Sequence, residues 1–417
     1  MLRCFGFKKR KMGILFRKER GELIFTKIGW ISLVTIIIGL SSSFVDTVWA
    51  VYMKGFIGNI ALIGFFSSFL TLVSFFSFFL TVPLIERSSK SRLLFITLLL
   101  FGFCYILFAV TNNFYLFIVL AIAVSVLISL RITCFGIIVR DSSSEKHLSR
   151  NEGLNYTFLN LAWLVGPLIA GLISKRYGIN LVFALSAVFV FIGLFIFKVS
   201  KIKDVNKKKR VDKNVIKNFF EFFKSKNRVL AYLLGGGVNL WWTFIFLFMP
   251  LYIIDENLGS LGIQWVGYFL FAAAIPLVLF EYFFADLAGK VGFKKIFKIG
   301  FFIPFLLSLM CFFVSNVYVV LFLVVLSSIG LSMLGATSES YFFDNLKGKQ
   351  ELRFYGPYNT AIDVNQFVGK IAASCVLLFL PFKFVFLLYS LFMFVLFLIS
   401  FKVKNIVEKR RDGRPNK

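Results

Sequence analysis

Long apolar stretches alternate with short polar connections along the whole chain. A helix crosses the hydrocarbon of a bilayer with roughly 20 apolar residues, and its backbone groups must find their partners within the same segment. Barrel strands need only about ten residues, so stretches of this length predict helices. The pattern predicts an all-α membrane protein with twelve spans, over residues 28–50, 60–84, 93–111, 114–139, 154–174, 178–198, 229–254, 262–285, 296–314, 317–342, 355–381 and 383–402.

Charge is segregated from these spans. The chain carries 47 Lys and Arg against 20 Asp and Glu, and nearly all of the cations lie in the two tails and the even-numbered connections. Under the positive-inside rule, both termini face the cytoplasm and the protein resides in an inner or plasma membrane. The chain then divides into a basic tail over 1–27, a six-helix bundle over 28–198, a basic cytosolic linker over 199–228, a second six-helix bundle over 229–402 and a cytosolic tail over 403–417.

The linker opens with the basic run from Lys207 to Arg210 and closes with four phenylalanines between Phe219 and Phe223. Such an amphipathic segment is expected to rest as a helix on anionic lipid. Binding of nucleic acid or of a partner protein is the alternative. Because the cations of the chain are spread over loops between spans, nucleic acid is not expected as a partner.

The second half of the chain repeats the first at an offset of 203 residues. At this offset Gly64 aligns with Gly267, and Asn113 aligns with Asn316. The register holds without a gap from the second to the fifth span. Parallel repeats of this kind, joined by a cytosolic loop, rock about a central site to give alternating access. The sequence therefore predicts two pseudo-symmetric six-helix bundles.

Two loops at equivalent positions of the repeat carry imperfect copies of one sequence motif. Residues 84–92 read Leu-Ile-Glu-Arg-Ser-Ser-Lys-Ser-Arg, and their repeat over 287–295 reads Leu-Ala-Gly-Lys-Val-Gly-Phe-Lys-Lys. Both resemble motif A of the major facilitator superfamily, G-x-L-A-D-R-x-G-R-K, and the chain resembles that superfamily over nearly its whole length. The resemblance implies a major facilitator fold with a cytoplasmic gate, in which a glycine turn, an acid and bases hold helix ends together. Plain basic loops are the alternative to a gate formed by Glu86, Arg87, Asp286, Lys290 and Gly292.

Residues 166–171 read Gly-Pro-Leu-Ile-Ala-Gly and resemble motif C of the same superfamily, G-P-x-x-G-G. The resemblance implies proton-coupled export, because this motif is associated with drug/proton antiporters. Gly166 and Gly171 also let helices approach closely, and Pro167 bends the span. Close packing alone is therefore the alternative interpretation.

Ionisable residues inside spans are the main candidates for chemistry, because a charge in lipid is costly unless it faces protein or water. Asp46 shares a helical face with Gly39, Ser42 and Ser43, which together form a small-residue wall that we expect to face substrate. In the fourth span, Arg131 resembles the buried arginine of the superfamily's motif B. Counting helix rise from the cytoplasmic ends places Arg131 well below Asp46, so the two are not expected to touch.

A polar stripe follows one face of the eleventh span and comprises Asn359, Asp363, Gln366 and Lys370. Asp363 lies at about the same height as Arg131, so we expect a contact there between the two halves. A buried carboxylate whose cationic partner changes during the cycle can take up a proton on one side and release it on the other. A static network between helices is the alternative.

Three further cavity candidates lie in the seventh and tenth spans. They are Asn239 and Trp242, which can hydrogen-bond or stack on a ligand, and Glu339, which shares a face with Ser332 and Gly335. Enzymatic chemistry is not expected, because the sequence contains no catalytic triad, P-loop or dinucleotide turn. With a single histidine and cysteines mostly in apolar runs, no metal or other cofactor is expected either. A proton gradient is the expected energy source.

These features favour a monomeric secondary transporter that exports small amphipathic compounds, with the bilayer, the solute and protons as its partners. An uptake symporter for a sugar, nucleoside or other nutrient is the first alternative, but it needs more hydrogen-bonding groups in the cavity spans. A non-transporting receptor or scaffold is the alternative of another class. The charges retained in the spans argue against it, because a scaffold gains nothing from them.

Overall fold

The structure is a computed structural model that describes residues 15–19, 22–142, 148–200, 202, 215–346 and 350–403. Twelve helices in this part of the chain are long and apolar enough to cross a membrane. The predicted all-α membrane fold with twelve spans is thus confirmed. Most of the predicted tails lies outside the described residues.

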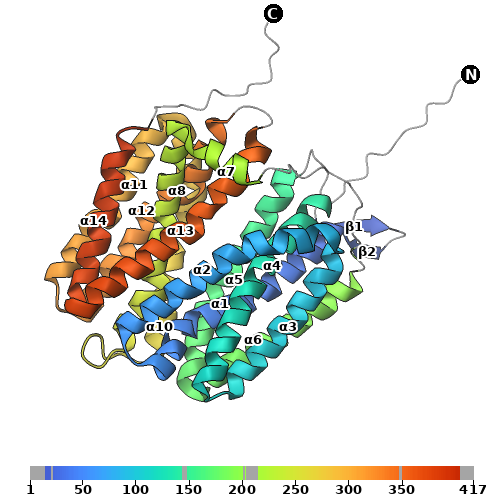
Figure 1. Cartoon of the computed structure of the whole chain (residues 1–417), viewed down its shortest axis with the longest axis horizontal. Coiled ribbons are helices and arrows are strands. Elements are labelled where there is room, and N and C mark those ends of the chain that lie inside the picture. The colour runs from blue at the N-terminus through green and yellow to red at the C-terminus, as the bar shows by residue number, and fades with distance from the viewer. Residues whose placement is uncertain are drawn as a thin grey trace, which may run out of the picture.

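The spanning helices form two bundles, a blue-to-green group and a yellow-green-to-red group in Figure 1. The first bundle contains α1 (Lys27–Ile57), α2 (Ile60–Arg87), α3 (Lys90–Val110), α4 (Phe114–Ser142), α5 (Leu148–Tyr177) and α6 (Ile179–Val199). In the second bundle, α8 (Lys226–Thr243), η2 (Phe244–Phe248) and α9 (Met249–Ile254) form one span, followed by α10 (Gln264–Val291), α11 (Phe293–Phe313), α12 (Val317–Asp344), α13 (Gln350–Phe379) and α14 (Lys383–Ser400).

The structure repeats at nearly the same offset as the sequence. Helices α10 to α14 begin and end 201 to 204 residues after α2 to α6. The matched asparagines cap equivalent helices: Asn113 Oδ1 accepts from the backbone N–H of Tyr115 at 2.9 Å, and Asn316 Oδ1 accepts from that of Tyr318 at 2.9 Å. Each asparagine satisfies a donor that the first turn of a helix leaves unpaired.

Several helices extend beyond the predicted spans. Helix α2 continues to Arg87, and α10 continues to Val291, six residues past the predicted end at 285. Hydropathy marks only the apolar part of a helix, whereas the backbone ladder continues through polar residues until a cap ends it. Gly292 ends α10 with φ +92°, a conformation that glycine adopts without strain.

The seventh span is not a regular helix. Between α8 and α9, the segment η2 has π-type bonding, and the N–H of Met249 reaches back to the carbonyl of Phe244. Pro250 follows directly and has no N–H to offer the preceding turn. Widened turns of this type occur frequently at functional sites, and this one lies in the second half of the seventh span, after the cavity-lining residues of α8.

A small hairpin precedes the first helix, which the all-helical expectation did not include. Strands β1 (Phe16–Glu19) and β2 (Glu22–Phe25) pair antiparallel, with Phe16 opposite Phe25. One more hydrogen bond extends the hairpin: the backbone N–H of Thr26 donates to the carbonyl of Leu15 at 2.9 Å. Thr26 then caps α1, so part of the predicted tail is ordered against the start of the first span.

The linker contains a helix, α7 (Val215–Phe223), that packs on protein. Phe222 is fully buried, and its ring contacts those of Tyr232, Phe342 and Phe354 in the second bundle. Arg353 at the start of α13 binds Asn218 and Glu221 of α7. The expectation of a helix resting only on lipid is therefore wrong for this face, because an aromatic cage and an ion pair attach it to the second bundle.

Candidate functional site

Four ionisable side chains from three helices meet in the middle of the membrane region. Asp46 of α1 interacts electrostatically with Arg131 of α4 and with Lys370 of α13. Lys370 also interacts with Asp363, two turns before it on α13. Two carboxylates and two cations thus compensate one another, which lowers the cost of placing charge inside the bilayer. Both halves of the protein contribute to this charge cluster.

Arg131 is held by the first helix. Its Nη1 donates to Ser42 Oγ at 2.6 Å, and its guanidinium lies 5.2 Å from the centroid of the Phe101 ring. Ser42 is one turn from Asp46. Arg131 therefore lies near enough to Asp46 to interact with it electrostatically. As expected from their different heights, no hydrogen bond or ion pair joins the two residues, both of which the structure describes.

Lys370 connects the two halves. Its Nζ donates to Thr71 Oγ1 of α2 at 2.7 Å. Arg131 and Asp363, both in the described part of the chain, are not paired in this conformation, because Arg131 is engaged by α1 and Asp363 interacts with Lys370. The polar stripe of α13 thus contacts the first half through Lys370 rather than through Asp363. Gln366 is half-buried between Asp363 and Lys370 on the same helix.

The residues of the small-residue wall of α1 face two different neighbours. Gly39 packs against Ala162 of α5, and Ser43 is buried against Gly166 of the same helix. Ser42 and Asp46 are only half-buried and lie beside Arg131. The glycine and the inner serine therefore serve packing within the first half, and only the other two residues remain available to a solute.

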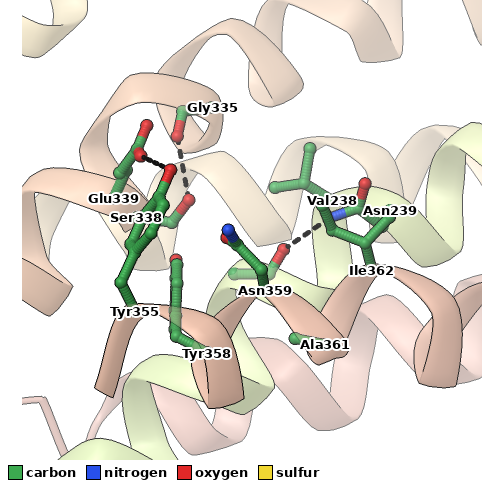
Figure 2. Close-up of a pocket in the computed structure, with 11 residues that line it drawn as sticks. Val238, Asn239, Gly335, Ser338, Glu339, Tyr355, Tyr358, Asn359, Ala361 and Ile362 are labelled. Carbon is green, nitrogen blue, oxygen red and sulfur yellow. Dashed lines mark hydrogen bonds between the residues drawn. The ribbon is translucent and has the colours of Figure 1, made fainter. Parts of the chain in front are cut away.

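A cavity of about 180 Å³ lies in the second half between α8, α12 and α13. Figure 2 shows Glu339 and Tyr355 on one side of it, Asn239 on the other and Asn359 between them. The Tyr355 hydroxyl donates to Glu339 Oε1 at 3.1 Å, and Asn239 Nδ2 donates to the carbonyl of Gly235 at 3.3 Å. Three of the residues expected to contact a solute, Glu339, Asn239 and Asn359, are thus brought together.

Trp242 lies outside this cavity. Its ring centroid is 5.5 Å from that of Phe246 in η2, which in turn is 5.2 Å from that of Trp163 in α5. Because α5 and η2 belong to different halves, these rings form an aromatic bridge between them. The structure therefore places Trp242 at the junction of the bundles.

The halves are joined at the end where α1 and α9 finish, which we call the far end. There Lys54 Nζ binds Asp255 Oδ2 at 2.7 Å. Gly64 of α2 faces Ser374 of α13, and Gly171 of α5 faces Gly267 of α10. Gly64 and Gly267 are repeat mates, so each supports the same close approach in one of two symmetric interfaces.

Toward the opposite end, where α1 starts and α14 finishes, the two groups of helices separate (Figure 1). Lys290 and Asp286 form an exposed ion pair at 2.5 Å within α10, rather than with the first half. Arg87 is exposed, and the side chain of Glu86 lies outside the described residues. This conformation is thus held closed at the far end, whereas the ribbons of the two bundles lie apart at the end that bears the termini (Figure 1).

The segment resembling motif C serves packing in two directions. Gly166 lies against Ser43 of α1, inside the first half. A Cβ added at Gly171 would lie 2.9 Å from Gly267 Cα, so this glycine permits contact between the halves. Pro167 is buried within α5, between the two glycines.

Sequence reasoning did not identify several residues of this site. Thr71 looks like any hydroxyl in an apolar span, and its role follows only from the neighbouring α13. Tyr355 could have been found, because it continues the polar face of Asn359 by one turn toward the start of α13. Tyr358 is next to Asn359 in sequence and lies off that face. No local pattern relates Lys54 to Asp255. The position of Lys54 is nevertheless unusual, because it lies outside the connections that carry most of the cations.

Two six-helix bundles related by an internal repeat, closed at one end around charges from both halves, define a polytopic membrane protein of the kind that carries solutes. The chain matches the Major Facilitator Superfamily over residues 31–303 and 242–416, and it belongs to that superfamily. It is therefore a multi-pass membrane protein of a transporter family.

The chain is also similar to individual proteins. It is 24% identical over 234 residues to an uncharacterized MFS-type transporter of Methanocaldococcus jannaschii, a match that covers 54% of this chain and 58% of that protein. The crystal structure of peptide transporter POT in complex with sulfate aligns with a TM-score of 0.71 at 13% identity, over 93% of this chain and 94% of that one. The nucleoside transporter NupG aligns with a TM-score of 0.72 at 14% identity, over 91% and 100%. At such low identity, these structures establish the fold alone.

Proposed function

We propose that this protein is a proton-coupled secondary transporter that exports small amphipathic compounds by alternating access. The observation that carries the proposal is the charge cluster of Asp46, Arg131, Asp363 and Lys370, to which both halves contribute. When the halves rock, the contacts of Lys370 with Thr71 and Asp46 must change, because they cross the moving interface. A carboxylate that loses its cation then gains a proton more easily.

Among the described residues, the two halves are joined at the far end and not at the opposite end, and this arrangement corresponds to one state of that cycle. Because nearly all cations flank the end that bears the termini, the positive-inside rule places that end in the cytoplasm. The conformation is then open to the cytoplasm and closed outward by Lys54, Asp255 and the paired glycines. Closure of the inner end would bring together the loops at Arg87 and Lys290. This cycle needs no cofactor, because the proton gradient supplies the energy.

Export rather than uptake is favoured by the segment from Gly166 to Gly171, which resembles motif C. The cavity walls combine the rings of Tyr355 and Tyr358 with amide, hydroxyl and carboxylate groups, which suits an amphipathic compound. An uptake symporter for a sugar, nucleoside or other nutrient is the alternative, and the sign of the proton flux distinguishes the two. A scaffold function is disfavoured, because the four charges of the cluster would then bring only cost.

The proposal is tested with purified protein in liposomes that carry an imposed pH gradient. Wild-type protein should release protons from the lumen when an amphipathic substrate is added, whereas Asp46→Asn and Asp363→Asn should lower this flux at least tenfold. Glu256→Gln, which removes an exposed carboxylate outside both the cluster and the predicted gate, is the matched control. Proton flux that is equal in all four proteins would refute coupling through the cluster. Flux of the opposite sign would indicate uptake.

A further inference from the structure

The cavity of the second half differs from the central cluster in its charge balance. Glu339 is the only acidic or basic side chain among the described residues that line it. Among the described residues Glu339 takes part in no ion pair, and its hydrogen-bond donor is the neutral hydroxyl of Tyr355. The central cluster, by contrast, balances two carboxylates with two cations. The cavity therefore carries a negative group with no counter-charge among the described residues, near the end of α12.

A second carboxylate strengthens this site. A Cβ added at Gly335 would lie 2.6 Å from Glu281 Oε1, so the carboxylate of α10 stands directly against the α12 wall of the cavity. Glu281 does not itself line the cavity, so its field reaches a bound cation through the α12 wall at Gly335. Between partly buried groups, where water screens less, such a field attracts a cation more strongly than it would in bulk water.

Aromatic rings complete the walls. Tyr358 stacks on Phe342 with ring centroids 4.0 Å apart, and Tyr355 stacks on Phe343 at 5.7 Å. These stacks fix the orientation of both tyrosines. A cation over a ring face is attracted by its quadrupole, and the attraction grows when water is excluded. A carboxylate beside fixed aromatic rings suits an ammonium group better than an anion or a neutral polyol.

We propose that this cavity, between α8, α12 and α13, binds the ammonium group of an organic cation, with Glu339 as its counter-charge and Tyr355 and Tyr358 as its aromatic walls. The inference rests on the proposed transport function and specifies its substrate class. At about 180 Å³, the cavity has roughly the volume of six water molecules, so it accepts an ammonium head group with a small apolar attachment. The remainder of a larger compound would extend toward Asn359 and the central cluster.

The test measures equilibrium binding to detergent-purified full-length protein without any gradient, by isothermal titration calorimetry. The probes are benzyltrimethylammonium, the neutral benzyl alcohol and the anion phenylmethanesulfonate. We expect binding of the cation alone. Glu339→Gln should weaken it at least tenfold, Glu281→Gln should weaken it less, and Asp286→Asn should leave it unchanged. Glu339→Asp, which keeps the charge, should retain binding within about threefold and serves as the control for folding.

The outcomes separate this inference from the function on which it rests. Cation binding that is lost in Glu339→Gln, in a protein that shows no proton flux in liposomes, supports the site and overturns the proposed coupling. Absence of cation binding, or equal binding by wild type and Glu339→Gln, overturns the site even where proton flux is observed with another compound. Equal binding of the anion and the cation also overturns it.

Discussion

Lys54, in the last turn of α1, and Asp255, directly after α9, form an ion pair of 2.7 Å that ties the two halves together at the far end. The residues are 201 positions apart in the chain. Their side chains are 23% and 17% exposed, so water screens the pair only in part. Together with the glycine contacts nearby, the pair stabilises the conformation in which this end is closed.

Removal of this pair should favour opening of the far end. A partly exposed ion pair contributes about 1 kcal/mol or less, so Lys54→Ala should raise the population of the open conformation by about two- to fivefold. Distance distributions between spin labels across the far end measure this population. Lys175→Ala is the control, because it removes an exposed cation at the same end that forms no ion pair among the described residues. An equal shift in both variants would contradict a specific role for Lys54.

A larger side chain at Gly171 should prevent closure. Since even a Cβ at this position would lie 2.9 Å from Gly267 Cα, Gly171→Leu cannot be accommodated while α5 and α10 remain in contact. We expect a far end that stays open, and transport reduced at least tenfold. Gly136→Leu is the matched control, because a Cβ at Gly136 meets nothing within 4 Å. The same spin-label distances check the result, and a closed far end in Gly171→Leu would refute it.

The attachment of the linker helix should depend on one face of α7. Phe222 is 0% exposed, whereas Phe220 on the same helix is 67% exposed. Replacing a buried Phe by Ala costs about 3–5 kcal/mol in water-soluble proteins, whereas an exposed replacement costs about 0.5 kcal/mol or less. Phe222→Ala should therefore release α7 and speed tryptic cleavage of the linker, and Phe220→Ala should not. Equal cleavage rates would show that lipid, rather than the aromatic cage, holds the helix.

Asp46 and Lys370 should act as one unit. Lys370→Met removes the cation that both carboxylates share and the donor to Thr71, so transport should fall at least tenfold. Residues that act through the same contact have non-additive effects. The double variant Asp46→Asn/Lys370→Met should therefore lose little more than either single variant in the liposome assay. Effects that add in full would show that the two residues act independently.

Much of the architecture follows from local pattern. The count of twelve spans comes from hydropathy, since each span must pair its own backbone in lipid regardless of its neighbours. The repeat is also visible in the sequence, because Asn113 and Asn316 perform the same capping task at equivalent helix starts. The N-terminal hairpin was not predicted, because eight residues of strand near a basic tail leave little periodic signal.

The sequence by itself determined which residues carry unusual chemistry: Asp46, Arg131, Glu339, Asp363 and Lys370 stand out because charge is rare in apolar spans. Only the tertiary structure decided their partners. Arg131 meets Ser42 rather than Asp363, and Lys370 reaches Thr71 in the other half. Helical periodicity fixes the face of a residue on its own helix, whereas the rotation, tilt and spacing of two helices arise from packing between distant segments.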